Sequence, residues 1–406
     1  MSKAPLEGIR VADFCWAWAG PYGALQLAHL GAEVIRIEST TRMCPSRLIP
    51  PWADNIQQGY NRSGYFNQYN QGKRSLTLNL KTPEGLDIAK KLVAKSDIVV
   101  ENFAARVMDK MGLGYETLRK IKADIIMASL SGYGATGPES SYVSYGPPQV
   151  ALSGMASLTG YHREDSPKQA GFSYGDPNGG VHGTFAILCA LLHRQKTGEG
   201  QYIDLSQREA CAMLLPEGLM DFVMNGEQPP RNGNRDPYMV PHGVFRSKGE
   251  DRWVSLVART DDEWRKMCAV MGKTELASDP RFATLAARKE NEDALEEIVT
   301  TWTRERSAED ATQQLQQAGI PSYPSLDGRD MLANPQVEAR GFFVELPHPE
   351  VGVRRHLGIP WQMSHTPCEI RRPAPVLGQD TDYVLEQILG LKGDEIVNLR
   401  EKEVLV

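Results

Sequence analysis

The 406-residue sequence lacks the features that mark several large classes of protein. No apolar run approaches the ~18 residues that a bilayer-spanning helix needs, and the N-terminal residues lack the apolar stretch of a secretory signal. Lys and Arg total 45 against 51 Asp and Glu, a formal net charge of −6, so a basic surface for nucleic acid is not expected. These absences predict a soluble cytoplasmic protein with neither a membrane nor a nucleic acid as partner.

Paired cysteines are also missing. No two of the six form a Cys-x-x-Cys motif. We therefore interpret all six as free thiols in a reducing compartment, and we expect no metal site. The six are Cys15, Cys44, Cys189, Cys211, Cys268 and Cys368.

The N-terminal region predicts a βαβ unit without the glycine pattern of a dinucleotide site. Residues 9–14 and 33–38 have the composition of strands, and residues 22–30 that of a helix closed by a glycine. Glu38 ends the second strand, where a ribose-binding acid sits in dinucleotide folds. The turn at residues 16–23 does not contain Gly-x-Gly-x-x-Gly, however, so we expect no nucleotide redox cofactor.

The composition of the remaining chain divides it into a large domain, a small domain and two connecting segments. Residues 1–217 alternate strands with helices, which predicts a Rossmann-like, largely parallel sheet covered by helices, and residues 380–406 are expected to return to it. Residues 218–243, rich in Asn, Gly, Pro and Arg, predict a linker. Residues 244–323 predict a smaller α+β domain. The Pro-rich, strand-like residues 324–379 predict an extended linker that wraps over a surface.

The most informative segment is residues 171–180, which read Gly-Phe-Ser-Tyr-Gly-Asp-Pro-Asn-Gly-Gly. It sets Asp176 among glycines, on a predicted tight turn just before a helix that begins near Val181. A carboxylate displayed in this way can act as a nucleophile or a base. An Asp-Pro turn that only caps the helix is the alternative interpretation.

Motifs elsewhere in the chain favour the functional interpretation. They follow one another in the order 5–14, 19–21, 30–38, 70–76, 80–85, 97–103, 131–134, 153–154, 171–180 and 196–201. In this order they closely resemble the family III CoA-transferases, the group that contains the formyl-CoA and carnitine CoA-transferases. The resemblance covers the first half of the chain, and later segments fit more loosely.

The resemblance implies that Asp176 is the catalytic nucleophile. Its carboxylate would attack the donor thioester to give a mixed anhydride, and CoA would then convert this anhydride into an aspartyl-CoA thioester. An ordinary aspartate has a pKa of about 3.9, so it is ionised at neutral pH without a helper base. We expect backbone N–H groups at Gly179, Gly180 or the Trp18–Ala19 turn to stabilise the oxyanions.

The resemblance also implies where coenzyme A, the expected substrate cofactor, binds. Three positions depart from the family pattern: Lys110 replaces an Arg found in many relatives, and Ser39 and Trp18 replace an Arg and a Gln of formyl-CoA transferase. Arg74 is a further possible phosphate partner. The implied contacts are Trp18, Ala19, Leu78, Lys81, Asn102, Phe103, Ala104, Arg106, Lys110 and Ser144.

Two other functions share this fold. An α-methylacyl-CoA racemase uses a His with an Asp as paired bases, but Tyr145 stands at the aligned position and no His lies between residues 30 and 161. A non-catalytic binding subunit is disfavoured because Asp176 is retained. Two assemblies remain as alternatives. One is a homodimer, which the resemblance implies is intertwined, and in the other the chain is the catalytic subunit of a heteromeric transferase.

The resemblance implies that the substrates are an acyl-CoA and an organic acid. The segment 231–239 lacks the run of glycines that formyl-CoA transferase carries there, so an acid larger than formate or oxalate is expected. Arg42, Arg47 and Arg235 are candidates to pair with the distal carboxylate of a dicarboxylate, with succinyl-CoA as the donor. Surface charge is the alternative interpretation of all three.

Overall fold

The computed structural model describes residues 3–162, 164, 166–169 and 171–406. The chain divides into a large unit of residues 1–155, 170–220 and 336–406, and a small unit of residues 156–169 and 221–335. This differs from the linear division expected above, because residues 156–169 belong to the small unit and residues 336–379 to the large one.

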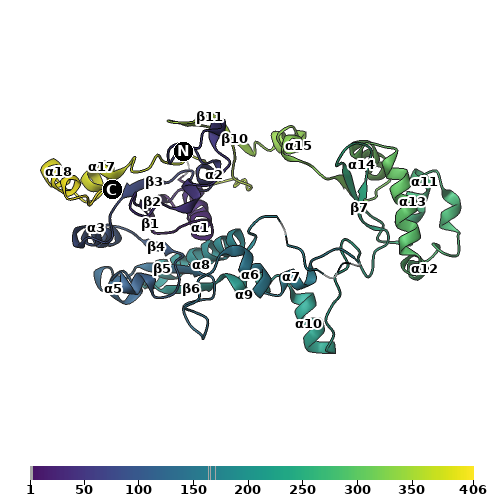
Figure 1. Ribbon diagram of the computed structural model, residues 1–406, viewed down its shortest axis with the longest axis horizontal. Coiled ribbons are helices and arrows are strands. Elements are labelled where there is room, and N and C mark those ends of the chain that lie inside the picture. The colour runs from purple at the N-terminus through teal and green to yellow at the C-terminus, as the bar shows by residue number, and fades with distance from the viewer. Residues whose placement is uncertain (1–2, 163, 165, 170) are drawn as a thin grey trace. The chain divides into compact units, whose positions relative to one another are not determined.

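The large unit is built on a six-stranded parallel sheet (Figure 1). Its strand order, β3-β2-β1-β4-β5-β6, is that of a Rossmann fold, so the predicted fold class is confirmed. The strands are β1 (Arg10–Asp13), β2 (Glu33–Glu38), β3 (Arg74–Thr77), β4 (Ile98–Glu101), β5 (Ile126–Ser131) and β6 (Tyr202–Ser206).

Both faces of this sheet are buried, since alternate strand residues enter different hydrophobic clusters. Ala12 and Val99 pack with helix α3, α5 and the C-terminal residues, whereas Val11 and Ile98 pack with α1 and α8. The helices that lie in this unit or cross its limits are α1 (Ala19–His29), α2 (Gly64–Tyr69), α3 (Pro83–Ala94), α4 (Val107–Lys110), α5 (Tyr115–Ile121), α6 (Gly146–Leu152), α7 (Met155–Leu158), α8 (Gly175–Thr197), α9 (Gln207–Ala212), α10 (Pro216–Asn225), α16 (Pro335–Ala339), α17 (Thr381–Tyr383) and α18 (Gly393–Glu401).

Local sequence signals set several of these helix ends. Thr82 caps α3 by accepting a hydrogen bond from the backbone N–H of Gly85, and Pro83 occupies the first helical position. Short turns complete the unit: η1 (Pro45–Arg47), η2 (Ala53–Asn55) and η4 (Val384–Ile388).

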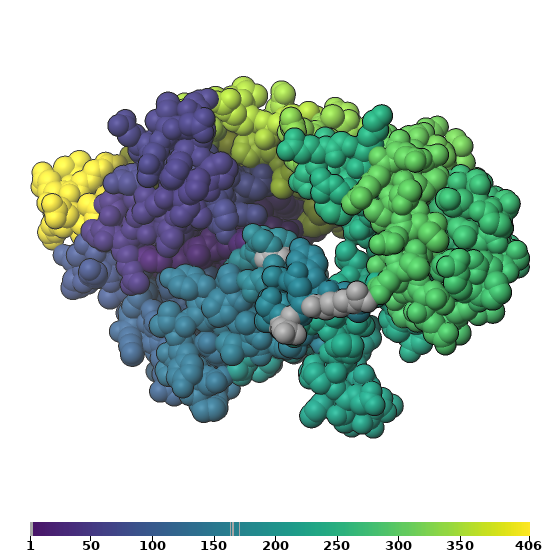
Figure 2. All heavy atoms as spheres, turned by 45° about the vertical axis from the view of Figure 1, so that its right-hand side comes forward, coloured from purple at the N-terminus to yellow at the C-terminus, as the bar shows by residue number. Residues whose placement is uncertain are grey.

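The C-terminal residues pack into the core of the large unit. Val384, Leu385 and Ile396 join the cluster that also holds Ile88 and Leu92 of α3. Figure 2 shows the yellow C-terminal residues packed against the purple and blue N-terminal ones.

The segment 324–379 is not the uniformly extended linker that its composition suggested. It contains α15 (Gly328–Leu332), α16 and a hairpin of β10 (Phe343–His348) and β11 (Gly352–Leu357). The hairpin contacts N-terminal residues of the large unit in the same chain. Arg354 contacts Asp54 at 2.6 Å, and the Gln68 side chain accepts a hydrogen bond from the N–H of Leu357 at 3.1 Å.

The small unit combines a three-stranded antiparallel sheet, in the order β7-β8-β9, with helices around a core that includes Trp264, Phe282 and Trp302. Its α+β class agrees with the prediction. Among the described residues, no helix of either unit combines the length and the apolar character needed to span a membrane. The remaining elements are β7 (His242–Arg246), β8 (Trp253–Val257), β9 (Ser322–Pro324), α11 (Asp261–Val270), η3 (Thr274–Ala277), α12 (Leu285–Glu290), α13 (Glu292–Arg304) and α14 (Ala308–Gln317).

Candidate active site

Asp176 lies where the N-termini of three helices meet. It is the second residue of α8, and its carboxylate accepts hydrogen bonds from the backbone of Ala19, the first residue of α1, and of Gly146, the first residue of α6. The helix therefore begins at Gly175 instead of near Val181, and the acid stands in the first helical turn, not on a preceding turn. Free N–H groups and the positive ends of helix dipoles favour an anion at such a place.

Burial is the largest influence on this carboxyl group, and it raises the pKa of Asp176 above the ordinary value. The Ser173 hydroxyl, which donates to Asp176 Oδ2, and the backbone groups of Ala19 and Gly146 act in the opposite direction. The result is a carboxylate largely removed from water but held in one orientation by several donors.

Gly146 makes this close approach possible. A β-carbon at that position would overlap both Asp176 Oδ2 and Ser173 Oγ. Only a residue without a side chain lets the start of α6 bring its N–H to the carboxylate.

Gly179 and Gly180 have a different role from the oxyanion donors expected above. They lie in the second turn of α8, where N–H groups point to carbonyl groups one turn earlier in the helix. A β-carbon on Gly180 would lie 2.7 Å from the carbonyl oxygen of Ala19, and one on Gly179 would lie 2.8 Å from the Gln207 side chain. The two glycines therefore serve close packing, and the donors near Asp176 come from α1 and α6.

A cavity of about 600 Å³ opens beside Asp176. It lies within the large unit, and half of its lining residues are aromatic. Its lining residues are Ala17, Trp18, Tyr65, Tyr69, Tyr145, Pro147, Gly171, Phe172, Ser173 and Asp176.

Apart from Ser144, which follows β5, the residues expected to bind CoA follow the carboxyl ends of β1, β3 and β4, the edge at which parallel sheets bind ligands. Asn102 holds this edge together: its side chain accepts the N–H of Trp16 at 2.7 Å and donates to the Trp16 carbonyl at 2.8 Å. Phe103 packs edge-on against the Trp16 ring, with 6.0 Å between centroids. Asn102 and Phe103 thus connect β4 to the turn that leads into α1.

The other predicted CoA residues differ in accessibility. Lys81, Arg106 and Lys110 are exposed and Ala104 is half-buried, whereas the Leu78 side chain is 1% exposed and belongs to the core. Ser144 stands before α6, where its hydroxyl contacts the Gln149 side chain. Leu78 can therefore offer a ligand only its backbone.

Comparison with known proteins identifies the family. The model for CoA-transferase family III matches residues 6–381. The chain belongs to CoA-transferase family III. It is 33% identical to the succinate–glutarate CoA-transferase of Agrobacterium fabrum, over 95% of this chain and 96% of that protein.

Other members of the family show a similar level of sequence identity to this CoA-transferase. The acetyl-CoA:oxalate CoA-transferase of Acetobacter aceti is 35% identical over 84% of this chain and 86% of its own. The β subunit of the succinyl-CoA–L-malate CoA-transferase of Chloroflexus aurantiacus is 30% identical over 99% and 98%. The crystal structure of a CaiB/BaiF family protein from Brucella suis superimposes with a TM-score of 0.87 at 30% identity, covering 96% of this chain and all of that one.

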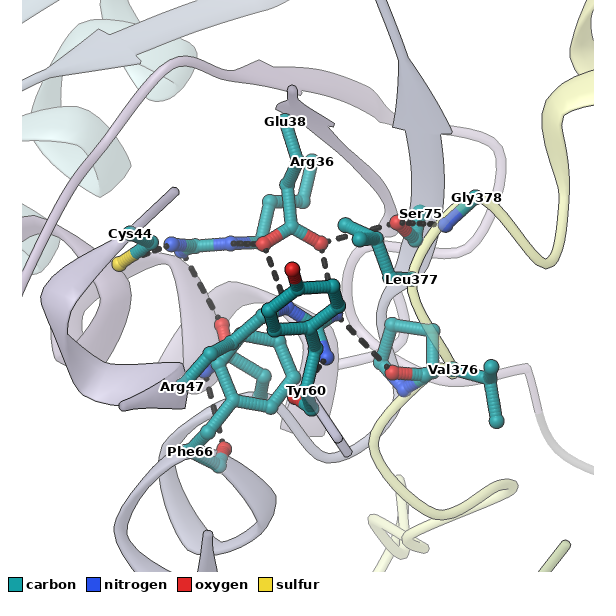
Figure 3. A network of polar contacts seen from close by, with 12 residues as sticks. Arg36, Glu38, Cys44, Arg47, Tyr60, Phe66, Ser75, Val376, Leu377 and Gly378 are labelled. Carbon is teal, nitrogen blue, oxygen red and sulfur yellow. Dashed lines mark hydrogen bonds and ion pairs between the residues drawn. The ribbon is translucent and has the colours of Figure 1, made fainter. Parts of the chain in front are cut away.

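Arg47, expected to bind substrate, is instead a buried structural residue of this CoA-transferase (Figure 3). Its guanidinium pairs with both carboxylate oxygens of Glu38, at 2.9 and 2.7 Å, and lies 3.5 Å from the Phe66 ring centroid. Its remaining N–H groups donate to carbonyl oxygens of Tyr60, Asn61 and Pro375. No donor of Arg47 is left for a substrate carboxylate.

The same network explains why Glu38 is not a ribose-binding acid. Besides Arg47, Glu38 contacts Arg36 at 3.2 Å and accepts the Ser75 hydroxyl at 2.9 Å. Burial opposes ionisation of Glu38, but the two guanidinium groups prevail and lower its pKa to about 2. The carboxylate is fully engaged inside the protein.

Of the other arginines singled out from the sequence, Arg235 and Arg74 are paired with protein carboxylates and Arg42 lies over an aromatic ring. Arg235 lies in the small unit and pairs with Glu296 at 2.7 Å, and with Asp293 and Glu292. Arg74 is the first residue of β3, at the end opposite the carboxyl edge of the sheet, and it pairs with Glu33 and Asp380. Arg42 is exposed, and its guanidinium lies 4.7 Å from the Trp16 ring centroid. None of these arginines lines the cavity beside Asp176.

Several cavity residues were missed by the sequence analysis. Tyr65 and Tyr69 stand one turn apart on α2, a spacing that places both rings on one helix face. Phe172 and Ser173 lie in the segment of Asp176 itself. Tyr145, at the position of the racemase histidine, also lines the cavity, and no histidine is among the described residues that do so.

Proposed function

We propose that this chain transfers CoA from an acyl-CoA donor to the carboxylate of an organic acid through covalent intermediates on Asp176. The observation that carries the proposal is a half-buried aspartate beside a cavity in a family III CoA-transferase, held by backbone donors from two helix starts and by the Ser173 hydroxyl. CoA is a substrate, and the contacts proposed for it are those at the carboxyl edge of β1, β3 and β4.

The proposed sequence of steps balances without an external acid or base. An Asp176 oxygen attacks the thioester carbonyl, the C–S bond breaks, and a mixed anhydride and CoA thiolate result. The thiolate attacks Asp176 Cγ, which releases the donor's acid and leaves an aspartyl-CoA thioester. The acceptor carboxylate then attacks Cγ and expels the thiolate, which attacks the acceptor's carbonyl carbon to form the new acyl-CoA and free Asp176.

The oxyanions formed in these steps require donors already in place. The N–H groups of Ala19 and Gly146 meet that requirement, because both already point to the carboxylate. The Tyr65 hydroxyl is a third candidate: burial first, and the charge of Asp176 second, raise its pKa far above 10, so it stays a donor.

Succinyl-CoA is our proposed donor, since two of the relatives above carry succinate or succinyl-CoA in their names. The proposed assembly is a homodimer, supported by apolar side chains exposed on α8 and α10 such as Phe185, Phe222 and Val223. A heteromer is the alternative, since one relative is named as a β subunit. Sedimentation of the pure chain distinguishes these: a stable, active monomer excludes both.

Replacing Asp176 tests the nucleophile. Asp176→Ala and Asp176→Asn should reduce CoA transfer by about a thousandfold or more, while CoA itself still binds. Asp87→Asn, on the exposed face of α3, is the matched control and should behave as wild type.

A trapping experiment locates the intermediate directly. Wild-type enzyme incubated with succinyl-CoA and hydroxylamine should release CoA and carry a hydroxamate on the peptide that contains Asp176. Substantial turnover by Asp176→Ala, or a hydroxamate on another carboxylate, contradicts the proposal.

A further inference from the structure

The wall of the cavity beside Asp176 is a cluster of stacked aromatic side chains. The Trp18 ring lies 5.4 Å from that of Tyr65 and 5.1 Å from that of Tyr69, and the two tyrosine rings are 5.0 Å apart. The Phe172 ring is 6.5 Å from Trp18. These four residues, called here the aromatic wall, come from the start of α1, from α2 and from the loop before α8.

This wall offers no positive charge. Among the described residues that line the cavity, Asp176 is the one Asp, Glu, Lys, Arg or His. Tyr65 and Tyr69 stay neutral because burial raises their pKa values, that of Tyr69 to about 12. A second carboxylate placed against these rings would lose hydration without gaining an ion pair, so the distal carboxylate of a succinyl donor has to point to the open side of the cavity and gains nothing from the rings.

We propose that the acid receiving CoA carries an aromatic or similarly bulky apolar group, as in an arylalkanoate, which binds against the aromatic wall. The inference rests on the transferase function proposed above and names its acceptor class. It replaces the dicarboxylate expected from the sequence, because Arg47 and Arg235 are neutralised by protein carboxylates and Arg42 stacks on Trp16.

The position of the wall fits the chemistry. The acceptor carboxylate has to reach Asp176 Cγ, so the rest of the acid must lie in the space that adjoins Asp176. Trp18 precedes Ala19, the backbone donor to Asp176, and Phe172 precedes Ser173, its hydroxyl donor. A ring stacked on Trp18 and Phe172 would therefore be fixed close to the reacting carbon.

The test measures kcat/KM for matched acceptors with succinyl-CoA as donor. We expect 3-phenylpropanoate to exceed glutarate by roughly ten- to a hundredfold, the range expected for burying one phenyl ring. Butanoate, which has neither a ring nor a second carboxylate, should fall below 3-phenylpropanoate.

Variants at Phe172 connect any preference to the wall. This side chain is 53% exposed, so Phe172→Arg should fold, and it places a cation where the ring was. We expect Phe172→Arg to lower the ratio of 3-phenylpropanoate to glutarate at least tenfold, and Phe172→Leu to lower it less. Tyr323→Arg, in the small unit and 52% exposed, is the control and should keep the wild-type ratio.

Failure of this inference is distinguishable from failure of the proposed function. The aromatic acceptor is ruled out if the ratio of kcat/KM for 3-phenylpropanoate to that for glutarate is below one, or if Phe172→Arg leaves this ratio unchanged. It is also ruled out if the hydroxamate forms on Asp176 but neither acid accepts CoA. If no hydroxamate forms on Asp176, the proposed transferase mechanism is wrong, and the proposed acceptor class, which depends on that mechanism, is wrong as well.

Discussion

Gly146→Ala should disable the active site without unfolding the protein. The new β-carbon would lie 2.7 Å from Asp176 Cγ, whereas carbon atoms in contact are about 3.5–4.0 Å apart. Relief of this overlap requires either the carboxylate or the start of α6 to move by about 1 Å. A displacement of that size at a reacting group is associated with roughly a hundredfold loss of rate.

The effect on stability should be smaller. Overpacking of one methyl group typically costs about 1–3 kcal/mol, and Gly146 belongs to neither of the two hydrophobic clusters of the large unit. Denaturant unfolding followed by circular dichroism measures this part, and CoA release from succinyl-CoA measures the catalytic part.

Gly171→Ala provides the matched control. Gly171 lines the same cavity, but a β-carbon there would meet no atom within 4 Å, so the variant should retain nearly full activity. If Gly146→Ala works within about threefold of wild type, the argument that Gly146 positions the nucleophile is wrong.

Two further predictions concern ionisation. Ser173→Ala removes a hydrogen bond that lowers the pKa of Asp176, so the acid limb of the pH–rate profile should move to higher pH; an unmoved limb would show that the hydroxyl is not an effective donor. Glu38 has its pKa lowered from 4.5 to about 2 in the folded protein, so its ion pairs with Arg36 and Arg47 stabilise the fold fully above pH 4.5, and this contribution is lost as the pH falls towards 2. Glu38→Gln should therefore cost about 3–5 kcal/mol at pH 7 in urea unfolding and distinctly less at pH 3; an equal cost at both would contradict the linkage.

The sequence was a good guide to features set by neighbouring residues. The alternation of buried strands with capped helices such as α3 predicted the parallel sheet, because periodicity and capping act within a few residues. The segment around Asp176 marked the candidate nucleophile for the same reason. The start of α8 was missed because Gly175, Asp176 and Pro177 are weak helix formers, which the packing of Gly180 against α1 outweighs.

The roles of the charged residues could not be derived in this way. Arg47 reads as a free cation along the chain, yet its guanidinium contacts Glu38 nine positions away and Pro375 328 positions away. Arg235 is likewise paired with acids 58 and 61 positions further on. Whether a charge is available to a ligand depends on these distant partners.

The aromatic wall was decided by tertiary structure in the same sense. Trp18, Tyr65, Tyr69 and Phe172 are unremarkable in their own segments, and they form a wall only because the sheet order brings α1, α2 and the loop before α8 to one edge. The sequence by itself determined the fold class, the family and the candidate nucleophile, since each is encoded in short motifs. Only the folded chain decided which side chains line the cavity, because residues that meet there, such as Trp18 and Phe172, lie 154 positions apart in the sequence.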